Sequence, residues 1–555
     1  MDGYAVPDFA TGTTVEVHGL TSSAGSRFNG CVGVVAQINE DGRHVIKLQG
    51  HDTQPVVKPS NLRKATPHLS SSCLGRGDFV EISGLSSECG RFLNGHLAQL
   101  RPAGPGNGRL LVKVCATGGE KAIKESNLLK LTQETVLARA EGLLEVGRLH
   151  DLQRLLRGVP FAPADLTKDL TARLATGTHS EILDGAVKLV DIPGKGKGYR
   201  ADRDISAGEA LLFDTAFCSS RAGPKEYEEM EAQCMKNTSA ADFFKTNVMT
   251  LEPGPWMTRM LDASRLQSIL KNNVFKTIRD PSMVALFPAA SRFNHSCCAN
   301  AFADTSSTQA TVRALRNIQA GEEVCVSYCA VAQTREDRIG QFVGKGFSCT
   351  CERCLLEESH DPQFSVPCRC GKYAFSAQST APAVQRCPDC SFSFSKKLCL
   401  EHLREIQDMN SFMRTPAAAA ENPMRLVEKL RPLVDRVTEG SNLAPKTHGE
   451  TIQLLNNFSA AHYFAATRVP GPHQDASFAA SFDCKKKVIR AQALNHGRGT
   501  SQRDVNYFQS LHRLLMGQFP TAADRREFEQ ELEGLCWLHF GQPTLPQGIT
   551  DPVCR

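Results

Sequence analysis

Cysteines at metal-ligand spacing are the residues of this sequence that point most directly to chemistry. Of the 21 cysteines, 12 lie between Cys297 and Cys399. Among them, Cys349, Cys351 and Cys354 form a C-x-C-x-x-C run. Thiolates at such spacing bind zinc, and a structural zinc site requires four ligands. The spacing therefore predicts a structural zinc site whose fourth ligand lies elsewhere in the chain.

A second group of cysteines follows this run. Cys368 and Cys370 form one close pair, Cys387 and Cys390 form another, and 16 residues separate the pairs. Gly371 comes directly after the first pair, as in the turn of a zinc ribbon. We therefore predict a second closed site of four thiolates, with free thiols as the alternative.

Composition and cysteine usage limit the class of protein. The 555 residues suggest three to five domains, and 41% apolar with 22% charged residues is ordinary for a globular protein. The sequence has no signal-peptide start and no apolar run of about 18 residues, so we expect no membrane partner. Clustered cysteines without an export signal favour a reducing compartment, either the nucleus or the cytoplasm.

The charge of the chain is modest. Its formal net charge is +5, and the longest basic cluster is Lys485–Lys487. A nucleic-acid footprint is normally a larger basic patch or stripe, so we do not expect direct nucleic-acid binding.

Three further segments combine residue types that could bind a ligand or act on it. They are Gly-Lys-Gly-Lys-Gly-Tyr at 194–199, Arg-Phe-Asn-His-Ser-Cys at 292–297 and Ala-Gly-Glu-Glu-Val-Cys-Val-Ser-Tyr at 320–328. Alternating glycines let a backbone approach a ligand closely, although a glycine-rich surface turn would look the same. A single histidine or tyrosine is equally compatible with a packed core.

Together with Phe-Ser-Cys-Thr-Cys-Glu-Arg-Cys at 347–354, these segments resemble, in the same order, a SET domain with its post-SET zinc knuckle. The resemblance covers roughly 186–356 and is greatest to the SET and MYND branch of the family. It implies a protein-lysine N-methyltransferase that transfers a methyl group from S-adenosyl-L-methionine to a substrate lysine amine.

The sequence departs from that branch in two places. Cys298 and Ala299 stand where the family commonly has a proline before Asn300. Residues 218–275 contain only two cysteines, so the cysteine-rich MYND finger is missing and no partner binding assigned to it carries over.

The resemblance also implies a role for each matching residue. It implies cofactor binding by Lys195, Lys197, Gly198, Tyr199, Asn273, Asn294, His295, Tyr328 and Phe347. It implies catalytic roles for Tyr328, His295 and Asn294. It further implies that Cys297 is the fourth ligand of the first zinc site, with the neighbouring Cys298 as the alternative.

These roles agree with the chemistry of methyl transfer. The methyl carbon of a sulfonium is already electrophilic, so the protein must chiefly place the amine about 3 Å from it. The lysine must arrive neutral although its unperturbed pKa is about 10.4. A narrow apolar channel beside a cation lowers that pKa through desolvation and like-charge repulsion. We expect Tyr328 to orient the amine rather than to accept its proton.

The elements that must position these residues suggest a multidomain protein. An internal repeat opens the chain: Val15–Leu20 returns as Val80–Leu85, and Asn29-Gly30 returns as Asn94-Gly95. Short β-rich runs with Gly and Asn-Gly turns in each unit predict tandem small SH3-like β-barrels.

We expect a mainly β SET fold with a helical insert to follow, then zinc-binding post-SET and ribbon segments and an α-helical C-terminal domain. The predicted boundaries are 1–66 and 75–131 for the repeats, 132–180 for a helical linker, 186–330 for the SET domain with its insert at about 218–280, 331–356 for the post-SET knuckle, 357–398 for the second ribbon and 399–555 for the helical domain.

Two functions remain compatible with this sequence. One is an active protein-lysine methyltransferase whose partner is a protein or peptide substrate, histone or non-histone. The other is a catalytically inactive SET scaffold that binds partners through its repeats and helices. The presence of Tyr328, Asn294 and His295 favours the enzyme. The substrate, the number of methyl groups added, the ligand of the repeats and the oligomeric state cannot be inferred from the sequence.

Overall fold

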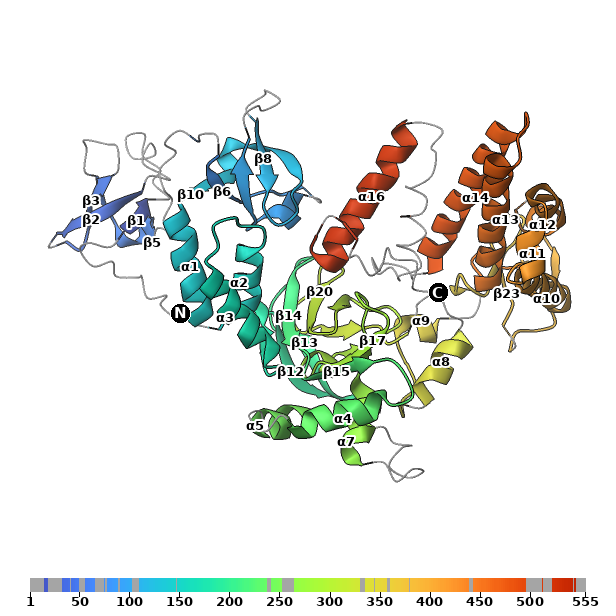
Figure 1. Cartoon of the computed structure of the whole chain (residues 1–555), viewed down its shortest axis with the longest axis horizontal. Helices are drawn as coiled ribbons and strands as arrows, with labels where there is room; N and C mark the ends of the chain where they lie inside the picture. Colours follow the sequence, from blue (N-terminus) through green and yellow to red (C-terminus); the bar gives the residue numbers. More distant parts are fainter. Residues whose placement is uncertain are drawn as a thin grey trace. The chain divides into compact units, whose positions relative to one another are not determined.

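The computed structural model divides the chain into two compact units, residues 1–166 and 167–555, which we describe separately (Figure 1). It describes residues 14–17, 32–39, 41–48, 55–64, 74, 77–87, 90–101, 109–145, 147–236, 241–251, 264–329, 335–343, 345–356, 360–378, 380–438, 443–495, 512, 522–542 and 544–545. No helix among these residues is both long and apolar enough to cross a membrane.

The sequence repeat in the first unit is also a structural repeat. The first sheet has the order β4-β3-β2-β1-β5 and consists of β1 (Thr14–Val17), β2 (Val32–Ile38), β3 (His44–Leu48), β4 (Val56–Val57) and β5 (Leu62–Lys64). The second has the matching order β9-β8-β7-β6-β10 and consists of β6 (Phe79–Ile82), β7 (Leu97–Leu100), β8 (Arg109–Val114), β9 (Glu120–Lys124) and β10 (Leu128–Leu131). In each, a 3₁₀ turn precedes the last strand.

The two sheets share one antiparallel topology, but closure into SH3-like barrels stays a prediction. The Asn-Gly pair of the second repeat forms a turn in which the Asn94 side chain bonds both backbone groups of Leu85 at 3.0 Å. The corresponding pair at 29–30 lies outside the described residues.

Helices follow the second sheet, as the 3.6-residue apolar spacing predicts. They are α1 (Gln133–Glu145), α2 (Leu149–Leu156) and α3 (Ala164–Ala175). The Thr132 hydroxyl accepts a hydrogen bond from the Thr135 backbone N–H at 3.1 Å, so it caps α1.

Three small sheets build the part of the second unit that carries the candidate site. The first consists of β11 (Ser180–Ile182), β14 (Ala210–Thr215), β20 (Gln309–Ala314) and β19 (Ala301–Thr305). The second consists of β12 (Val187–Ile192), β13 (Gly196–Ala201), β21 (Glu323–Val326) and β18 (Asn294–His295). The third consists of β15 (Cys218–Arg221), β17 (Met283–Leu286) and β16 (Phe275–Lys276). Alternate residues of β20 are buried, as expected for a strand with one face on a core.

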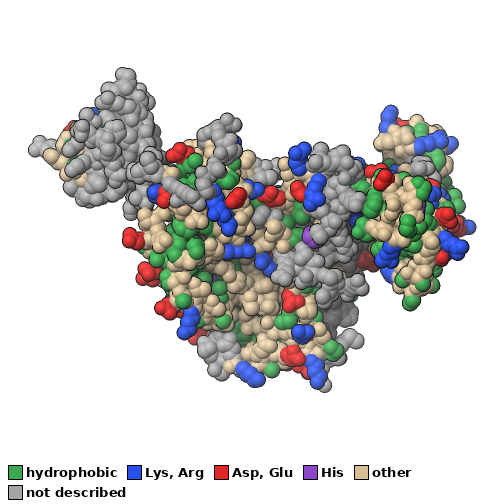
Figure 2. Space-filling view, turned by 45° about the horizontal axis from the view of Figure 1, so that its top comes forward, with side chains coloured by type: hydrophobic (Ala, Val, Ile, Leu, Met, Phe, Trp, Pro, Cys, Tyr) green, Lys and Arg blue, Asp and Glu red, His purple; other side chains and the backbone are tan. Residues whose placement is uncertain are grey.

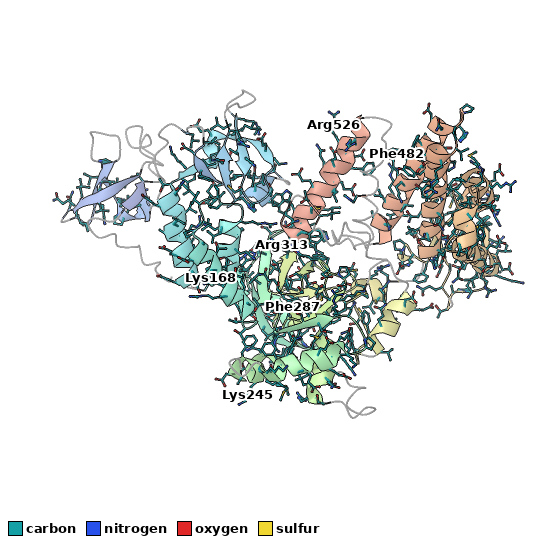
Figure 3. All side chains as sticks on the ribbon, in the orientation of Figure 1. Lys168, Lys245, Phe287, Arg313, Phe482 and Arg526 are labelled. Atoms are coloured by element: carbon teal, nitrogen blue, oxygen red, sulfur yellow. The ribbon has the colours of Figure 1, made fainter. Side chains whose placement is uncertain are left out.

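The first two sheets share one apolar core. Phe287 is fully buried within it and lies among the strands in Figure 3. Tyr199 and Phe293 pack there with ring centroids 4.4 Å apart. This core holds β13 and the start of β18 against each other, and both carry predicted site residues.

The predicted helical insert has its own core. It contains α4 (Glu226–Lys236), α5 (Ala241–Phe243), a π-helical turn (Phe244–Val248) and α7 (Arg265–Asn273). Apolar side chains of these helices pack on β15 and β17. The Ser264 hydroxyl accepts from the Gln267 N–H and caps α7, whose other end carries the predicted cofactor ligand Asn273.

Asp214 anchors the loop that leads into β18. Its Oδ2 accepts the backbone N–H groups of Ala289 and Ala290 at 2.8 and 2.9 Å, and its Oδ1 accepts the Ser180 hydroxyl at 2.6 Å. The residue is fully buried. Burial raises the pKa of Asp214 to about 6, although these hydrogen bonds and His179 act in the opposite direction.

We expect Asp214→Ala to lower the free energy of unfolding by about 2–4 kcal/mol, because it leaves buried N–H groups without acceptors. Asp214→Asn keeps an acceptor oxygen and should cost less than about 1 kcal/mol. Since the folded-state pKa lies above the unfolded one, the stability contributed by this carboxyl is present at low pH and lost as the pH rises through about 6. Denaturant unfolding at several pH values measures both effects, and equal losses for the two variants would contradict them.

The remainder of the second unit contains two cysteine-bearing segments and then helices. The post-SET segment has α8 (Arg335–Val343) and α9 (Glu352–Leu355), and the next segment has the hairpins β22–β23 (Ser365–Pro367, Ala374–Ser376) and β24–β25 (Val384–Arg386, Ser393–Ser395). The helices are α10 (Lys396–Phe412), α11 (Pro416–Ala420), α12 (Pro423–Thr438), α13 (Gly449–Arg468), α14 (Gln474–Asn495) and α16 (Ala522–Phe540).

The last helix packs on the sheet that carries β19 and β20. Phe302 of β19 contacts His539 of α16, with ring centroids 4.8 Å apart. Arg313 lies beside the C-terminal end of α16 in Figure 3, against Gly541. Phe482 of α14 packs on Phe528, so α16 contacts both the sheet and the helical segment.

Candidate functional site

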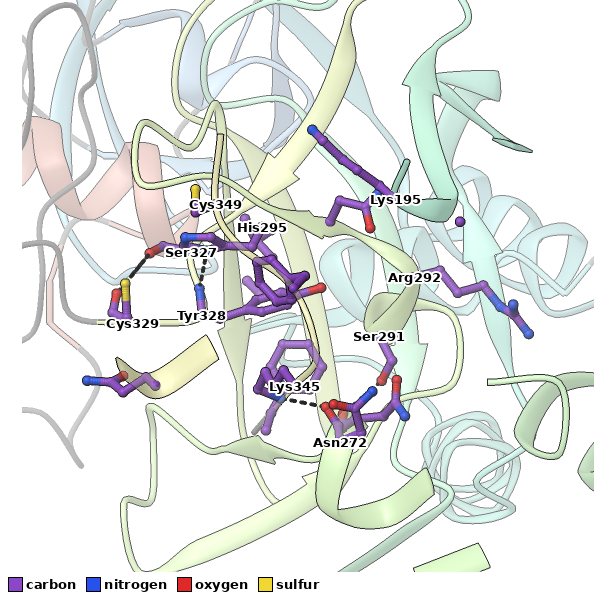
Figure 4. A pocket seen from close by; sticks show the side chains of 18 of the residues that line it. Lys195, Asn272, Ser291, Arg292, His295, Ser327, Tyr328, Cys329, Lys345 and Cys349 are labelled. Carbon is purple, nitrogen blue, oxygen red and sulfur yellow. Dashed lines mark hydrogen bonds between the residues drawn. The ribbon is translucent and has the colours of Figure 1, made fainter. Parts of the chain in front are cut away.

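A cavity of about 1070 Å³ collects most of the predicted site residues. Its walls are the Gly-Lys loop at 193–197, the end of α7 with β16, the strand β18, the residues that follow β21 and the segment 345–351. These segments are far apart in sequence, and the three-dimensional fold alone brings them to one place (Figure 4).

Seven of the nine residues predicted to bind the cofactor line this cavity. They are Lys195, Lys197, Asn273, Asn294, His295, Tyr328 and Phe347. The other two are buried beneath it: Gly198 lies against Asn294, and Tyr199 belongs to the core. The cofactor contacts of all nine stay predictions.

Strand pairing places the predicted catalytic residues next to each other. β18 pairs in parallel with β21, with Asn294 opposite Cys325 and His295 opposite Val326. Tyr328 follows β21 directly, and its backbone N–H donates to His295 Nδ1 at 3.0 Å. The Tyr328 hydroxyl donates to the Phe293 backbone oxygen at 2.6 Å. Tyr328 is therefore fixed by two hydrogen bonds, one from its backbone to His295 and one from its hydroxyl to Phe293.

His295 links this pair to the cysteines. Since Nδ1 accepts a hydrogen bond, the ring proton of the neutral form is on Nε2, which lies 3.3 Å from Cys297 Sγ. Burial lowers the pKa of His295 to about 4, with nearby charges acting in both directions. The imidazole is therefore neutral near pH 7, with Nδ1 bonded to the Tyr328 backbone and Nε2 facing Cys297 Sγ.

Glu323 belongs to the site although the sequence analysis gave it no role. Its carboxylate accepts hydrogen bonds from Lys195 Nζ at 2.7 Å and from Asn294 Nδ2 at 3.0 Å. Partial burial acts to lower the pKa of Lys195, but the hydrogen bond and charge of Glu323 outweigh it and the pKa is raised. The Gly-Glu-Glu motif was the feature of the sequence that could have pointed to Glu323. Each of its two carboxylates binds an asparagine side chain: Glu323 binds Asn294, and Glu322 binds Asn300 at 3.0 Å.

The first cysteine group fits a zinc ion. The Sγ atoms of Cys297, Cys349, Cys351 and Cys354 all lie within 4.8 Å of one another. Cys297 Sγ is 4.0 Å from Cys349 Sγ and 3.6 Å from Cys354 Sγ. A tetrahedron with Zn–S bonds of about 2.3 Å separates its sulfur atoms by about 3.8 Å. Cys298 is not in this group, whereas Cys329 lies near Cys297 and His295 and was not considered from the sequence.

Buried arginines beside this group were also missed. The side chains of Arg338 and Arg353 are almost fully buried and flank Asp361 at 3.9 and 3.4 Å. The Arg338 guanidinium also lies 4.0 Å from Cys354 Sγ. Four thiolates and one Zn²⁺ carry a net charge of −2, so guanidinium groups at this distance favour the deprotonated cysteines that zinc requires.

The second cysteine group forms two similar turns. Cys368 Sγ is 3.4 Å from Cys390 Sγ, and Cys370 Sγ is 3.6 Å from Cys387 Sγ. The two turns follow β22 and β24, and in each the residue after the second cysteine has a positive φ, 74° at Gly371 and 57° at Ser391. All four sulfur atoms lie within 4.8 Å of one another, so this group also fits a zinc ion.

Comparison with known proteins agrees with this geometry. A family model described as SET domain matches residues 196–329. The chain contains a SET domain. The match covers β13 to the end of the Tyr328 loop, which includes Asn294, His295 and Tyr328.

Curated relatives match parts of the chain. Histone-lysine N-methyltransferase set5 of Schizosaccharomyces pombe is 29% identical over 178 residues, covering 31% of this chain and 51% of that protein. N-lysine methyltransferase SMYD2 of Homo sapiens is 37% identical over 83 residues, covering 15% and 19%. Histone-lysine N-methyltransferase ATXR2 of Arabidopsis thaliana is 40% identical over 79 residues, covering 14% and 17%. The SET domain is thus related to those of SMYD-type lysine methyltransferases.

The matches span about half of the first relative and less than a fifth of the other two. The insert contains Cys218 and Cys234, whose Sγ atoms lie 3.4 Å apart. The absence of a MYND finger stays a prediction from the sequence.

Proposed function

We propose that this chain is a protein-lysine N-methyltransferase that uses S-adenosyl-L-methionine. The observation that carries the proposal is the position of Tyr328 in the cavity, with its hydroxyl 2.6 Å from the Phe293 backbone oxygen and its backbone bonded to His295. A hydroxyl and a carbonyl oxygen side by side can orient an amine through hydrogen bonds while leaving its lone pair free.

The cavity also has features that suit the cofactor. Gly194 and Gly196 adopt φ angles of 75° and 73°, and a Cβ atom on either would meet nothing within 4 Å. This loop therefore presents open backbone to the cavity, where Lys195 and Asn294 are held by Glu323. When bound, S-adenosyl-L-methionine supplies a methyl group on a positively charged sulfur.

The protein residues would then position the acceptor. Burial raises the pKa of Tyr328, with smaller contributions from Cys325 and Glu323. The phenol therefore keeps its proton at neutral pH and donates it to the Phe293 oxygen, so the phenol oxygen can accept a hydrogen bond from the substrate amine. We assign Tyr328 the orientation of the substrate amine, and Asn294 and His295 the support of the backbone around it. The proton of the incoming ammonium passes to solvent.

The test is transfer of tritiated methyl from labelled S-adenosyl-L-methionine into a proteome extract by the full-length, zinc-loaded protein. Label in discrete protein bands, recovered after hydrolysis as methyl-lysine, is the expected result. If folded protein labels nothing across several extracts and histone mixtures, the function is not this one and a binding scaffold takes its place.

Gly198 offers a second test, because a side chain at this position would press against Asn294, which lines the cavity. A Cβ atom would clash with Asn294 Nδ2 and would lie 2.8 Å from Ile192 Cγ1. We expect Gly198→Ala to displace Asn294 and weaken S-adenosyl-L-methionine binding at least about tenfold in calorimetric titration, a typical cost of overpacking. Gly340→Ala is the matched control, since a Cβ on that helical glycine meets nothing within 4 Å. Equal affinities for the two variants would contradict this role of Gly198.

A further inference from the structure

The charged side chains that line the cavity are all of one sign. They are Lys195, Lys197, Lys276, Arg292 and Lys345, and no aspartate or glutamate occurs among the lining residues that the structure describes. On the face drawn in Figure 2, by contrast, basic and acidic side chains are intermingled. The lining of the cavity therefore differs in charge from that face.

Carboxylates outside the lining neutralise two of these cations. Lys195 pairs with Glu323 at 2.7 Å and Lys197 with Asp191 at 2.9 Å. Lys276, Arg292 and Lys345 have no ion pair with any carboxylate in the described part of the chain. The Arg292 guanidinium bonds to the Asn247 oxygen at 3.1 Å and to the Thr250 hydroxyl at 2.6 Å, both uncharged.

Two of the three come from different segments that line the cavity. Lys276 ends β16 on the insert and is exposed. Lys345 follows α8 on the post-SET side, and its Nζ donates to the Asn272 backbone oxygen at 2.6 Å (Figure 4). That oxygen lies in the last turn of α7, where the helix dipole favours a cation. Lys345 is thereby held with its ammonium 5.4 Å from the centre of the Tyr328 ring.

We propose that this cavity selects target lysines whose neighbouring residues are acidic, so that its substrates are acidic protein segments rather than basic tails. The proposal rests on the proposed function and specifies its substrate class. A substrate segment that enters the cavity brings the side chains next to its target lysine toward Lys276 and Lys345, which both line the cavity. Aspartate or glutamate there is attracted by both, whereas arginine or lysine is repelled, and opposite charges of this kind set specificity between partners.

The environment of Lys345 adds to this preference. Burial lowers the pKa of Lys345 because the ammonium form is costly to desolvate. A substrate carboxylate near its Nζ offsets that cost. The sulfonium of the bound cofactor adds further positive charge to the cavity, and this penalises basic neighbours of the target lysine.

The experiment uses the full-length, zinc-loaded protein and peptides with one central lysine. One library randomises the three positions on each side with Asp, Glu and Ser, and the other with Arg and Ser, so that the central lysine is the one acceptor in both. Tritiated S-adenosyl-L-methionine reports transfer. The expected kcat/KM is at least about tenfold higher for the acidic library, with an advantage that shrinks as salt screens it. Lys276→Glu should reduce that advantage at least about threefold. Lys271→Glu is the matched control, since its ammonium lies 5.6 Å from the Tyr227 ring and does not line the cavity.

The outcomes separate the two proposals. If neither library nor any protein extract is labelled, the proposed function is wrong. If peptides are labelled but the basic library is equal or better, the charge selection is wrong and the methyltransferase stands. If Lys276→Glu raises the KM for S-adenosyl-L-methionine instead of changing peptide preference, this cation serves the cofactor, which also overturns the selection. If the Lys345→Gln variant loses the preference for acidic peptides but keeps its affinity for S-adenosyl-L-methionine, the charge selection is supported.

Discussion

Replacing Tyr328 with phenylalanine is expected to lower kcat for methyl transfer by at least about a hundredfold, the usual loss when one positioned hydrogen-bonding group is removed from a reacting centre. The hydroxyl that disappears is the one that lies 2.6 Å from the Phe293 oxygen. The backbone N–H of residue 328, which donates to His295, is retained in the variant, so the local fold is preserved. Initial rates with labelled S-adenosyl-L-methionine measure the effect, and calorimetry should show cofactor affinity within about threefold of wild type.

The matched control for this change is Tyr227→Phe. Tyr227 is a half-buried tyrosine of the insert that packs on Lys271 and does not line the cavity. Its variant should retain wild-type rates. If Tyr328→Phe retained more than about half of the activity, Tyr328 would not orient the acceptor, and the assignment of the transfer point to this end of β21 would fail.

Loss of the first zinc ion is expected to abolish methyl transfer. Cys297 lies directly after β18, whereas its three partner cysteines lie in the post-SET segment that carries Phe347 into the cavity. Zinc there would tie these two parts of the chain together, and structural zinc contributes directly to folding free energy. We expect Cys297→Ser to bind one zinc ion fewer by elemental analysis and to lose S-adenosyl-L-methionine binding at least about tenfold.

Two further variants make this prediction specific. Cys387→Ser should also bind one ion fewer, but with a smaller effect on the cofactor, since no residue between 365 and 395 lines the cavity. Cys115 belongs to neither cysteine group, so the Cys115→Ser variant should keep its full zinc content. Unchanged zinc content in Cys297→Ser would point to Cys298 or Cys329 as the fourth ligand.

Much of the local structure follows from periodicity and turn chemistry. The helical segment predicted after residue 131 contains α1 and α2, and the region predicted to be mainly β contains strands such as β12 and β20. The internal repeat corresponds to two sheets of the same strand order. These features depend on neighbours within a few residues, so a single sequence is enough to predict them.

The zinc groups were predictable for a similar reason. Each close cysteine pair sits in one tight turn, and the spacing within a turn is a local property. The pairing of the two turns around Cys368 and Cys387 needed only a short connection. Cys297 is different, because it lies 52 residues before Cys349, and its role came from the family resemblance.

The sequence by itself therefore determined many of the elements and the cysteine pairs. Through the SET resemblance it also predicted roles for Tyr328 and His295, which the structure places in one cavity. The tertiary structure alone decided which charges face the cavity. Glu323 reaches Lys195 across 128 residues, and Lys345 reaches Asn272 across 73. Such contacts depend on how separate elements pack, and no local propensity encodes them. The same packing leaves Lys276 and Lys345 without carboxylate partners among the described residues, although the whole chain has nearly balanced charge.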